Sequence, residues 1–222
     1  MTDELRKQNE RAIWDKIARS YDRNVMGTYE EAYRLTNEAI LSEITPNSSV
    51  LEIGCGTGIV SLAIAPHAGE VIGVDLSPSM IAQAEKKTHQ AAFQNLSFQE
   101  ADAYALPFED ESFDMVLLTN LLHVVAEPET VIQEACRVLR KSGILAAVTD
   151  CLAERVPFRV WFNLLTLRAM KLFGTVKVMH FLHKSDLRDW FKSNGIRIHK
   201  EAVLHAAPVN FYIAGSKGEG SP

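Results

Sequence analysis

Residues 49–59 read SVLEIGCGTGI, a short apolar run followed by three closely spaced glycines. The run predicts a buried strand, the glycines a tight turn, and a helix is expected to begin near Ile59. Glycine allows a positive φ and lets a ligand approach without meeting a Cβ, and the next helix offers free N–H groups. A glycine triplet alone is a weak signal. Its G-x-G-x-G spacing differs from the G-x-G-x-x-G of dinucleotide sites, because Ile59 stands where the third glycine would be.

Downstream of this loop, short apolar strands alternate with helices. Strands are expected at 70–75 (EVIGVD), 96–102 (LSFQEAD), 113–120 (FDMVLLTN) and 144–150 (ILAAVTD), with helices after Ser77-Pro78 and over 128–140. Alternation of this kind implies right-handed crossovers and a parallel sheet covered by helices on both faces. The near-continuous Val, Ile and Leu runs agree with burial on both faces.

The two ends of the chain do not follow this alternation of strands and helices. Before the loop we expect a short amphipathic helix through about Ser20 and a second helix over 29–43. After Asp150 we expect an inserted apolar helix, a helix capped by Ser185 and ended by Gly195, and a hairpin of strands 196–204 and 209–215. The predicted fold class is α/β, a Rossmann-like three-layer sandwich whose mostly parallel seven-stranded sheet ends in a C-terminal antiparallel hairpin.

Two carboxylates accompany the glycine loop. Asp75 ends the second predicted strand, where a carboxylate can accept hydrogen bonds from both hydroxyls of a ribose, although taken alone it is equally well a solvated acid. Glu52 lies inside the first strand, where a carboxylate is costly unless it meets a partner. A ligand ammonium would be a suitable partner.

Composition narrows the class of protein. A chain of 222 residues fits one large domain, and a net charge of -5 disfavours, without excluding, a basic nucleic-acid surface. Three cysteines without a CxxC pair and a start that does not resemble a signal peptide predict a cytoplasmic protein with reduced thiols. The longest uncharged apolar stretches, 115–126 and 160–167, are shorter than the ~20 residues of a membrane span.

Four segments together resemble a known family: VLEIGCGTG, VIGVDLSPSMI, EADAYALPFEDESFDMVLLTNLLHVV and ACRVLRKSGIL. They resemble the class I S-adenosylmethionine (SAM)-dependent methyltransferases, most closely the small-molecule branch that includes the ubiquinone/menaquinone-biosynthesis C-methyltransferases. The likeness is rich from residue 13 to residue 150, includes WDKIARSYD near the N-terminus, and is thin afterwards. One departure is Ser142-Gly143-Ile144, where the family usually has Pro-Gly-Gly in a loop remote from the cofactor.

The resemblance implies contacts to the methionyl part of SAM. Gly54, Gly56 and Gly58, with Cys55 between them, would surround it, and Glu52 would lie near its amino group. We interpret Cys55 as a residue that fits the turn rather than as a nucleophile.

The resemblance also implies contacts to the adenosyl part. Asp75 would bind the ribose, while Leu76 and Met80 would pack on the adenine. Asp102 would accept a hydrogen bond from the adenine amino group, and the backbone of Ala103 would read the ring edge.

Three further residues complete the expected site. The backbone of Asn120 would lie near the methionyl amine, and Tyr21 would close over the cofactor. A methyl group on a sulfonium is already activated, so positioning can supply up to ~7–11 kcal/mol of the barrier reduction. His123 is the best candidate for a base, because it follows the fourth predicted strand and histidine titrates near neutrality; a structural role is the alternative. No His or Cys spacing predicts a metal site.

We therefore expect one SAM-dependent methyltransferase domain over 1–222. Residues 1–48 would close the cofactor site, 49–150 would bind SAM, 151–184 would form an inserted substrate lid, and 185–215 would form the C-terminal helix and hairpin. The apolar part of the insert, 157–173, has three interpretations: a lid, a membrane-surface contact, or a helix packed on the sheet.

The expected reaction is in-line transfer of the SAM methyl group to a small, apolar or lipid/quinone-like acceptor, with S-adenosylhomocysteine (SAH) as product. A non-catalytic SAM-binding module and a nicotinamide-dependent oxidoreductase are the alternatives, and Ile59 counts against the second. No nucleic-acid partner is expected. The sequence does not identify the acceptor, the atom that is methylated or the oligomeric state.

Overall fold

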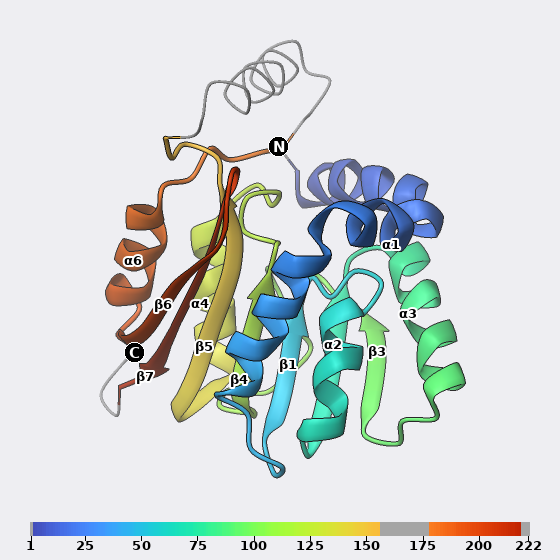
Figure 1. The fold of residues 1–222 in the computed structure, drawn as a ribbon, viewed down its shortest axis with the longest axis horizontal. Helices are drawn as coiled ribbons and strands as arrows, with labels where there is room; N and C mark the ends of the chain where they lie inside the picture. Colours follow the sequence, from blue (N-terminus) through green and yellow to red (C-terminus); the bar gives the residue numbers. More distant parts are fainter. Residues whose placement is uncertain (1, 156–177, 219–222) are drawn as a thin grey trace.

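The structure, a computed structural model, describes residues 2–155 and 178–218, so the predicted insert over 157–173 lies outside the described residues. Within these ranges one seven-stranded sheet has the order β3-β2-β1-β4-β5-β7-β6 (Figure 1). Its strands are β1 (Ser49–Ile53), β2 (Glu70–Asp75), β3 (Leu96–Glu100), β4 (Phe113–Thr119), β5 (Leu139–Cys151), β6 (Ile196–Ala206) and β7 (Val209–Lys217).

The pairing of the strands confirms the predicted fold class. Strands β3, β2, β1, β4 and β5 pair in parallel with one another in that order. Strand β7 pairs antiparallel with both β5 and β6. The chain adds strands outward from β1 to β2 and β3, then returns to add β4 and β5 on the other side. In open α/β sheets ligands bind at such a switch point, beyond the carboxyl ends of the strands.

Helices cover both faces of the sheet, and alternate residues of a strand face different cores. Val116 and Leu118 of β4 belong to one core, whereas Met115 and Leu117 belong to the other. The helices that contribute to the first core are α4 (Pro128–Val138) and α6 (Lys184–Ser193), and those that contribute to the second are α1 (Asp3–Leu41) and α2 (Ile59–Ile64). Helix α3 (Pro78–Ala91) packs beside β2 and β3, and a 3-10 turn, η1 (Ala65–His67), follows α2.

The two predicted N-terminal helices meet at a kink with no loop between them: the second begins at Tyr29 as expected, whereas the first continues past Ser20 to the kink. Helix α1 runs through Leu41 with a kink at Tyr29, whose φ is -122° and ψ 16°. The intervening YDRNVMGT contains no proline, and its single glycine costs only about 1 kcal/mol in a helix. The kink matters for the site, because the first half of α1 lies across the edge of the sheet while the second half runs down its face (Figure 1).

Two other expected boundaries also differ. Helix α6 starts after His183, whose backbone N–H donates to Asp186 Oδ2 at 2.8 Å, so the predicted Ser185 cap is wrong. Helix α4 ends at Val138, and β5 begins at Leu139 rather than at 144, because Phe113 of β4 pairs with Leu139. Gly143 permits this extension, since a Cβ there would lie 3.0 Å from the Asp114 carbonyl oxygen.

No helix within 2–155 or 178–218 combines the length and the apolar character that crossing a bilayer requires.

Candidate active site

A cavity, here called the main cavity, lies at the carboxyl ends of β1, β2 and β4. It brings together nine of the residues expected to contact the cofactor: Tyr21, Gly54, Gly56, Asp75, Leu76, Met80, Asp102, Ala103 and Asn120. It also includes Glu10, Trp14 and Tyr104, which the sequence analysis did not single out. Glu10 and Trp14 belong to α1; Trp14 opens the family-like WDKIARSYD segment but was assigned no contact there, and no local motif marks Glu10. Their place in the cavity wall follows from the path of α1 across the carboxyl ends of the strands.

Four expected site residues lie outside the main cavity. Glu52 and Cys55 line a small adjoining cavity, here called the loop cavity, together with Tyr21, Gly54 and Gly56. Gly58 is not among the lining residues of either cavity. His123 lines a further one, here called the second cavity.

Two glycines of the loop after β1 have different roles. Gly56, at φ +54°, has nothing within 4 Å of the position of a Cβ, which leaves open space on the side of the main cavity. Gly58, at φ +76°, precedes α2, and a Cβ there would lie 2.6 Å from Phe98 Cζ. Gly56 therefore provides access for a ligand, whereas Gly58 provides close packing between the loop and β3.

Asp75 connects the loops that follow β1 and β2. Its Oδ2 accepts a hydrogen bond from the Gly56 N–H at 2.9 Å, and its Oδ1 accepts one from the Ser77 N–H at 2.8 Å. Burial raises the pKa of Asp75, while these two backbone donors oppose that rise. The carboxylate thus holds the glycine loop in place and borders the main cavity, where its remaining lone pairs can accept from a ribose.

Glu52 has partners within the protein. Its Oε2 accepts from the Ser61 N–H at 2.9 Å and from the Ser61 hydroxyl, and its Oε1 accepts from the Thr119 hydroxyl. The residue is only 1% exposed, and burial raises its pKa to about 7 although all three donors lower it. The donors that a buried carboxylate requires are thus already present, and a ligand ammonium in the loop cavity would add to them.

Cys55 is buried, and its thiol donates to the Gly56 carbonyl oxygen at 3.7 Å. Burial raises the pKa of this thiol well above its usual value. A thiol held in its protonated form is a poor nucleophile, which agrees with a role in shaping the turn.

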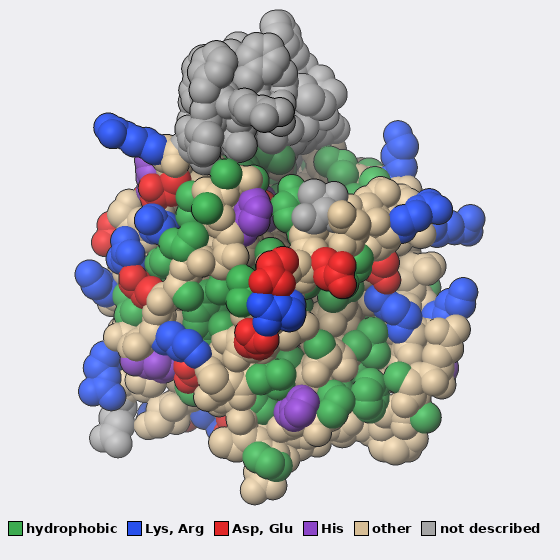
Figure 2. All heavy atoms as spheres, in the orientation of Figure 1, with side chains coloured by type: hydrophobic (Ala, Val, Ile, Leu, Met, Phe, Trp, Pro, Cys, Tyr) green, Lys and Arg blue, Asp and Glu red, His purple; other side chains and the backbone are tan. Residues whose placement is uncertain are grey.

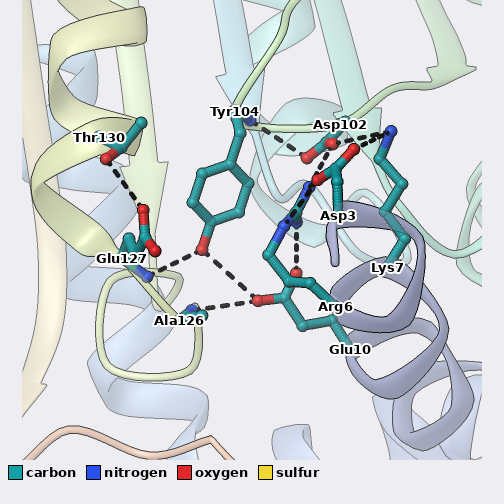
Figure 3. Close-up of polar contacts among 9 residues, drawn as sticks. All are labelled: Asp3, Arg6, Lys7, Glu10, Asp102, Tyr104, Ala126, Glu127 and Thr130. Carbon is teal, nitrogen blue, oxygen red and sulfur yellow. Dashed lines mark hydrogen bonds and ion pairs between the residues drawn. The ribbon is translucent and has the colours of Figure 1, made fainter. Parts of the chain in front are cut away.

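Asp102 is held by the first turns of α1 (Figure 3). Its Oδ2 pairs with Arg6 Nη2 at 2.6 Å and with Lys7 Nζ at 3.3 Å, and its Oδ1 accepts from the Tyr104 N–H at 3.2 Å. Arg6 also pairs with Glu10 at 2.8 Å, and its guanidinium lies 3.9 Å from the centroid of the Tyr104 ring. An adenine amino group at Asp102 would therefore share this carboxylate with Arg6. We refer to Arg6, Glu10, Asp102 and Tyr104 as the Arg6 cluster.

Further polar contacts fasten α1 to the loops at the sheet edge. The Ser77 hydroxyl donates to Asp15 Oδ1 at 2.5 Å, the Thr57 hydroxyl donates to Asp22, and Lys87 pairs with Asp22 at 2.7 Å. The first half of α1 is thus bonded to the loop after β1, to the loop after β2 and to α3. This half of α1 covers the main cavity.

The second cavity adjoins the main one, and Trp14, Tyr21 and Asn120 line both. His123 lies in its wall, and His123 Nδ1 is 2.9 Å from the Thr149 hydroxyl. Burial lowers the pKa of His123, against the opposing charge of Asp150. The imidazole is therefore neutral near pH 7 and able to accept a proton.

Over residues 2–155 and 178–218, no group of three His, Cys, Asp or Glu side chains is placed to hold a metal ion. On the face drawn in Figure 2, most Lys and Arg side chains lie around the outline, and one basic group lies near the centre between acidic side chains. Among the described residues on that face, Lys and Arg form no continuous patch.

Comparison with known proteins agrees with this geometry. A family described as "Methyltransferase domain" matches residues 51–147, which span β1 to β5. A phosphatidylethanolamine N-methyltransferase of Cereibacter sphaeroides is 34% identical over 149 residues, which cover 64% of this chain and 72% of that protein. A ubiquinone biosynthesis O-methyltransferase of Coxiella burnetii is 31% identical over 166 residues, which cover 72% of this chain and 68% of that protein.

Solved structures share the fold. The geranyl diphosphate C-methyltransferase of Streptomyces coelicolor, crystallised with Mg2+, geranyl diphosphate and SAH, has a TM-score of 0.68 to this chain. The sequence identity is 14%, and the match covers 83% of this chain and 78% of that one. This likeness concerns the fold alone.

Proposed function

Since this chain belongs to the class I SAM-dependent methyltransferases, we propose that it binds SAM in the main cavity and methylates a small acceptor in the second cavity. One observation carries the proposal: the two cavities meet at Trp14, Tyr21 and Asn120. In-line displacement requires donor and acceptor to lie side by side, and adjoining cavities lined by one helix, α1, would allow this.

The residues of the main cavity fit the cofactor. Asp75 offers acceptors for ribose hydroxyls, Leu76 and Met80 offer apolar surface for adenine, and the open side of Gly56 leaves room for the ligand. Gly54, the Asn120 backbone and Glu52 in the loop cavity are assigned to the methionyl part, and Asp102 with Ala103 to the adenine edge. SAM supplies a methyl group already activated by a sulfonium.

On the acceptor side, His123 is the proposed base. Because Nδ1 contacts Thr149, we assign Nε2 as the nitrogen that takes the proton of the acceptor. An apolar or lipid-like acceptor is supported by the aromatic lining of the second cavity and by the names of the two relatives, which act on a phospholipid and in ubiquinone biosynthesis. We also propose a cytoplasmic location for the protein and a substrate lid formed by residues 151–184.

The test is methyl transfer from labelled SAM to a panel of amines, phenols and hydroquinones, followed by detection of SAH. We expect SAH to accumulate only with an acceptor present, and His123→Asn to lower kcat about 100-fold or more while the Kd for SAH is unchanged. The exposed Asp189→Asn on α6 serves as the matched control. Failure of the folded protein to bind SAM or SAH would contradict the proposal.

A further inference from the structure

The wall of the second cavity combines aromatic rings with oxygen acceptors. Trp14, Tyr21, Tyr29 and Tyr33 supply the rings, all from α1. The lining also includes Asp150 near the end of β5 and Asn210 of β7. Among the described residues, no Lys or Arg lines this cavity.

Asn210 carries a buried acceptor in need of a donor. The residue is 6% exposed, and its Nδ2 donates to Asn120 Oδ1 at 3.1 Å and to Asp150 Oδ1 at 2.9 Å. Its Oδ1 is buried and has no hydrogen-bond partner within the described residues. Because buried polar atoms are nearly always hydrogen-bonded, this oxygen points to a ligand that donates.

The charges that line the second cavity favour a ligand of positive charge. The carboxylate of Asp150 is close enough to help burial raise the pKa of Tyr29. The imidazole of His123 is neutral because burial lowers its pKa. A negative side chain beside aromatic rings attracts a cation, through charge-assisted hydrogen bonds and through the ring faces, and repels an anion.

We propose that the second cavity binds an amine as its ammonium and that this nitrogen receives the methyl group. The inference rests on the proposed function and specifies its acceptor. Asp150 and the Oδ1 of Asn210 would accept N–H bonds from the ammonium, and Tyr29 and Tyr33 would face its charge. The sulfonium of SAM does not account for this wall, because Tyr29, Asp150 and Asn210 lie outside the main cavity.

The reaction balances without a further reactant. The ammonium transfers one proton to Nε2 of His123, which leaves a lone pair on the nitrogen. This lone pair forms the new N–C bond to the methyl carbon, while the S–C bond breaks and its electron pair stays on sulfur as SAH. The product is the N-methylated ammonium, and the proton on His123 leaves to solvent. Asp150 acts by holding and orienting the cation before and after transfer.

The test compares acceptors under identical conditions with the full chain and methyl-labelled SAM. The amine probes are ethanolamine and phosphatidylethanolamine in detergent micelles, and the competing probes are 4-methylcatechol and 1,4-naphthohydroquinone. We expect label on nitrogen of at least one amine probe and not on the catechol or the hydroquinone. Transfer to both amines supports the amine class, and transfer to phosphatidylethanolamine alone supports it and places the amine on a lipid headgroup.

A matched pair of variants tests the residues. Asp150→Asn keeps the size of the side chain and an oxygen for the Asn210 amide, but removes the charge. We expect kcat/KM for the amine to fall about 10-fold or more, with the Kd for SAH unchanged within about 2-fold. Asp189→Asn, exposed on α6, should leave both values unchanged.

Three results would overturn the amine assignment while leaving the proposed SAM site intact. They are transfer to the catechol or hydroquinone with none to the amines, transfer to an amine at the same kcat/KM in Asp150→Asn, and binding of SAH without binding or labelling of either amine probe. Loss of SAH binding by the wild-type chain would instead refute the proposed function on which the inference rests.

Discussion

At the scale of single residues, the candidate site depends on how buried acids are satisfied. Glu52 is a carboxylate inside an apolar strand, where it needs hydrogen-bond donors. Ser61 lies in the helix after the loop and Thr119 ends β4, and only the assembled sheet brings both hydroxyls to one carboxylate.

The pKa of Glu52 predicts a pH dependence of stability. The pKa of this carboxyl is 4.5 in the unfolded chain, and burial raises it to about 7 in the folded protein. Between these values the unfolded state binds fewer protons, so the free energy of unfolding decreases as pH rises through this window and then levels off. The contribution is on the order of 3 kcal/mol.

Glu52→Gln removes this titration. Urea denaturation of both proteins from about pH 5 to about pH 8 should show the variant gaining stability relative to wild type as pH rises, whatever their absolute difference. Parallel curves across this range would show that Glu52 does not titrate as the buried group described above.

The glycine loop gives a second prediction for single residues. Both Gly56→Ala and Gly58→Ala place a Cβ at positive φ, which costs about 1–2 kcal/mol. Gly58→Ala also meets Phe98, so its loss of stability should be the larger of the two. Gly56→Ala should instead cause the larger loss of SAM affinity. Denaturation and calorimetry of both variants check this, and the opposite ranking in both measurements would contradict the division of roles.

At the scale of elements, helix α1 determines how the cofactor is enclosed. Arg6 is only 7% exposed and connects α1 to Asp102 and Tyr104 in the wall of the main cavity. We expect Arg6→Ala to raise the Kd for SAH about 10-fold and to speed SAH release. The reason is that α1, which covers the main cavity, loses its contact with Asp102.

The control for Arg6 lies on the same helix. Arg34→Ala removes an exposed arginine that pairs with Glu31 and Glu38, and exposed pairs of this kind contribute less than about 1 kcal/mol. Stopped-flow release of SAH should therefore be unchanged in Arg34→Ala. Equal effects of the two substitutions would mean that general loss of helix stability, not the Arg6 cluster, controls release.

The elements differ in how well sequence patterns predict them. Apolar runs bounded by glycine and acidic residues locate β1, β2 and β4 correctly, because burial on both faces leaves a continuous apolar signal. The early start of β5 depends on tertiary contacts. The pairing of Leu139 with Phe113 is one such contact, and no local pattern records it.

At the scale of the whole molecule, the two cavities also differ in how well the sequence predicts their residues. The main cavity is built largely from loops that follow neighbouring strands, so Asp75 could be singled out from its place at a strand end, whereas Asp102 and Asn120 were expected from the family resemblance. The second cavity is assembled from α1, β5 and β7 as well as the loop after β4. Tyr29, Asp150 and Asn210 are far apart in the sequence, and of the residues that line the second cavity but not the main one, only His123 was proposed from the sequence.

The most direct test of the account is calorimetric titration of the folded protein with SAM. We predict a single site for wild type and for Asp189→Ala, no heat with NAD, and about 100-fold weaker binding for Asp75→Ala, since hydrogen bonds from a ribose to a charged carboxylate would be lost. Absence of SAM binding by wild type, or equal affinity in Asp75→Ala, would contradict a cofactor site in the main cavity.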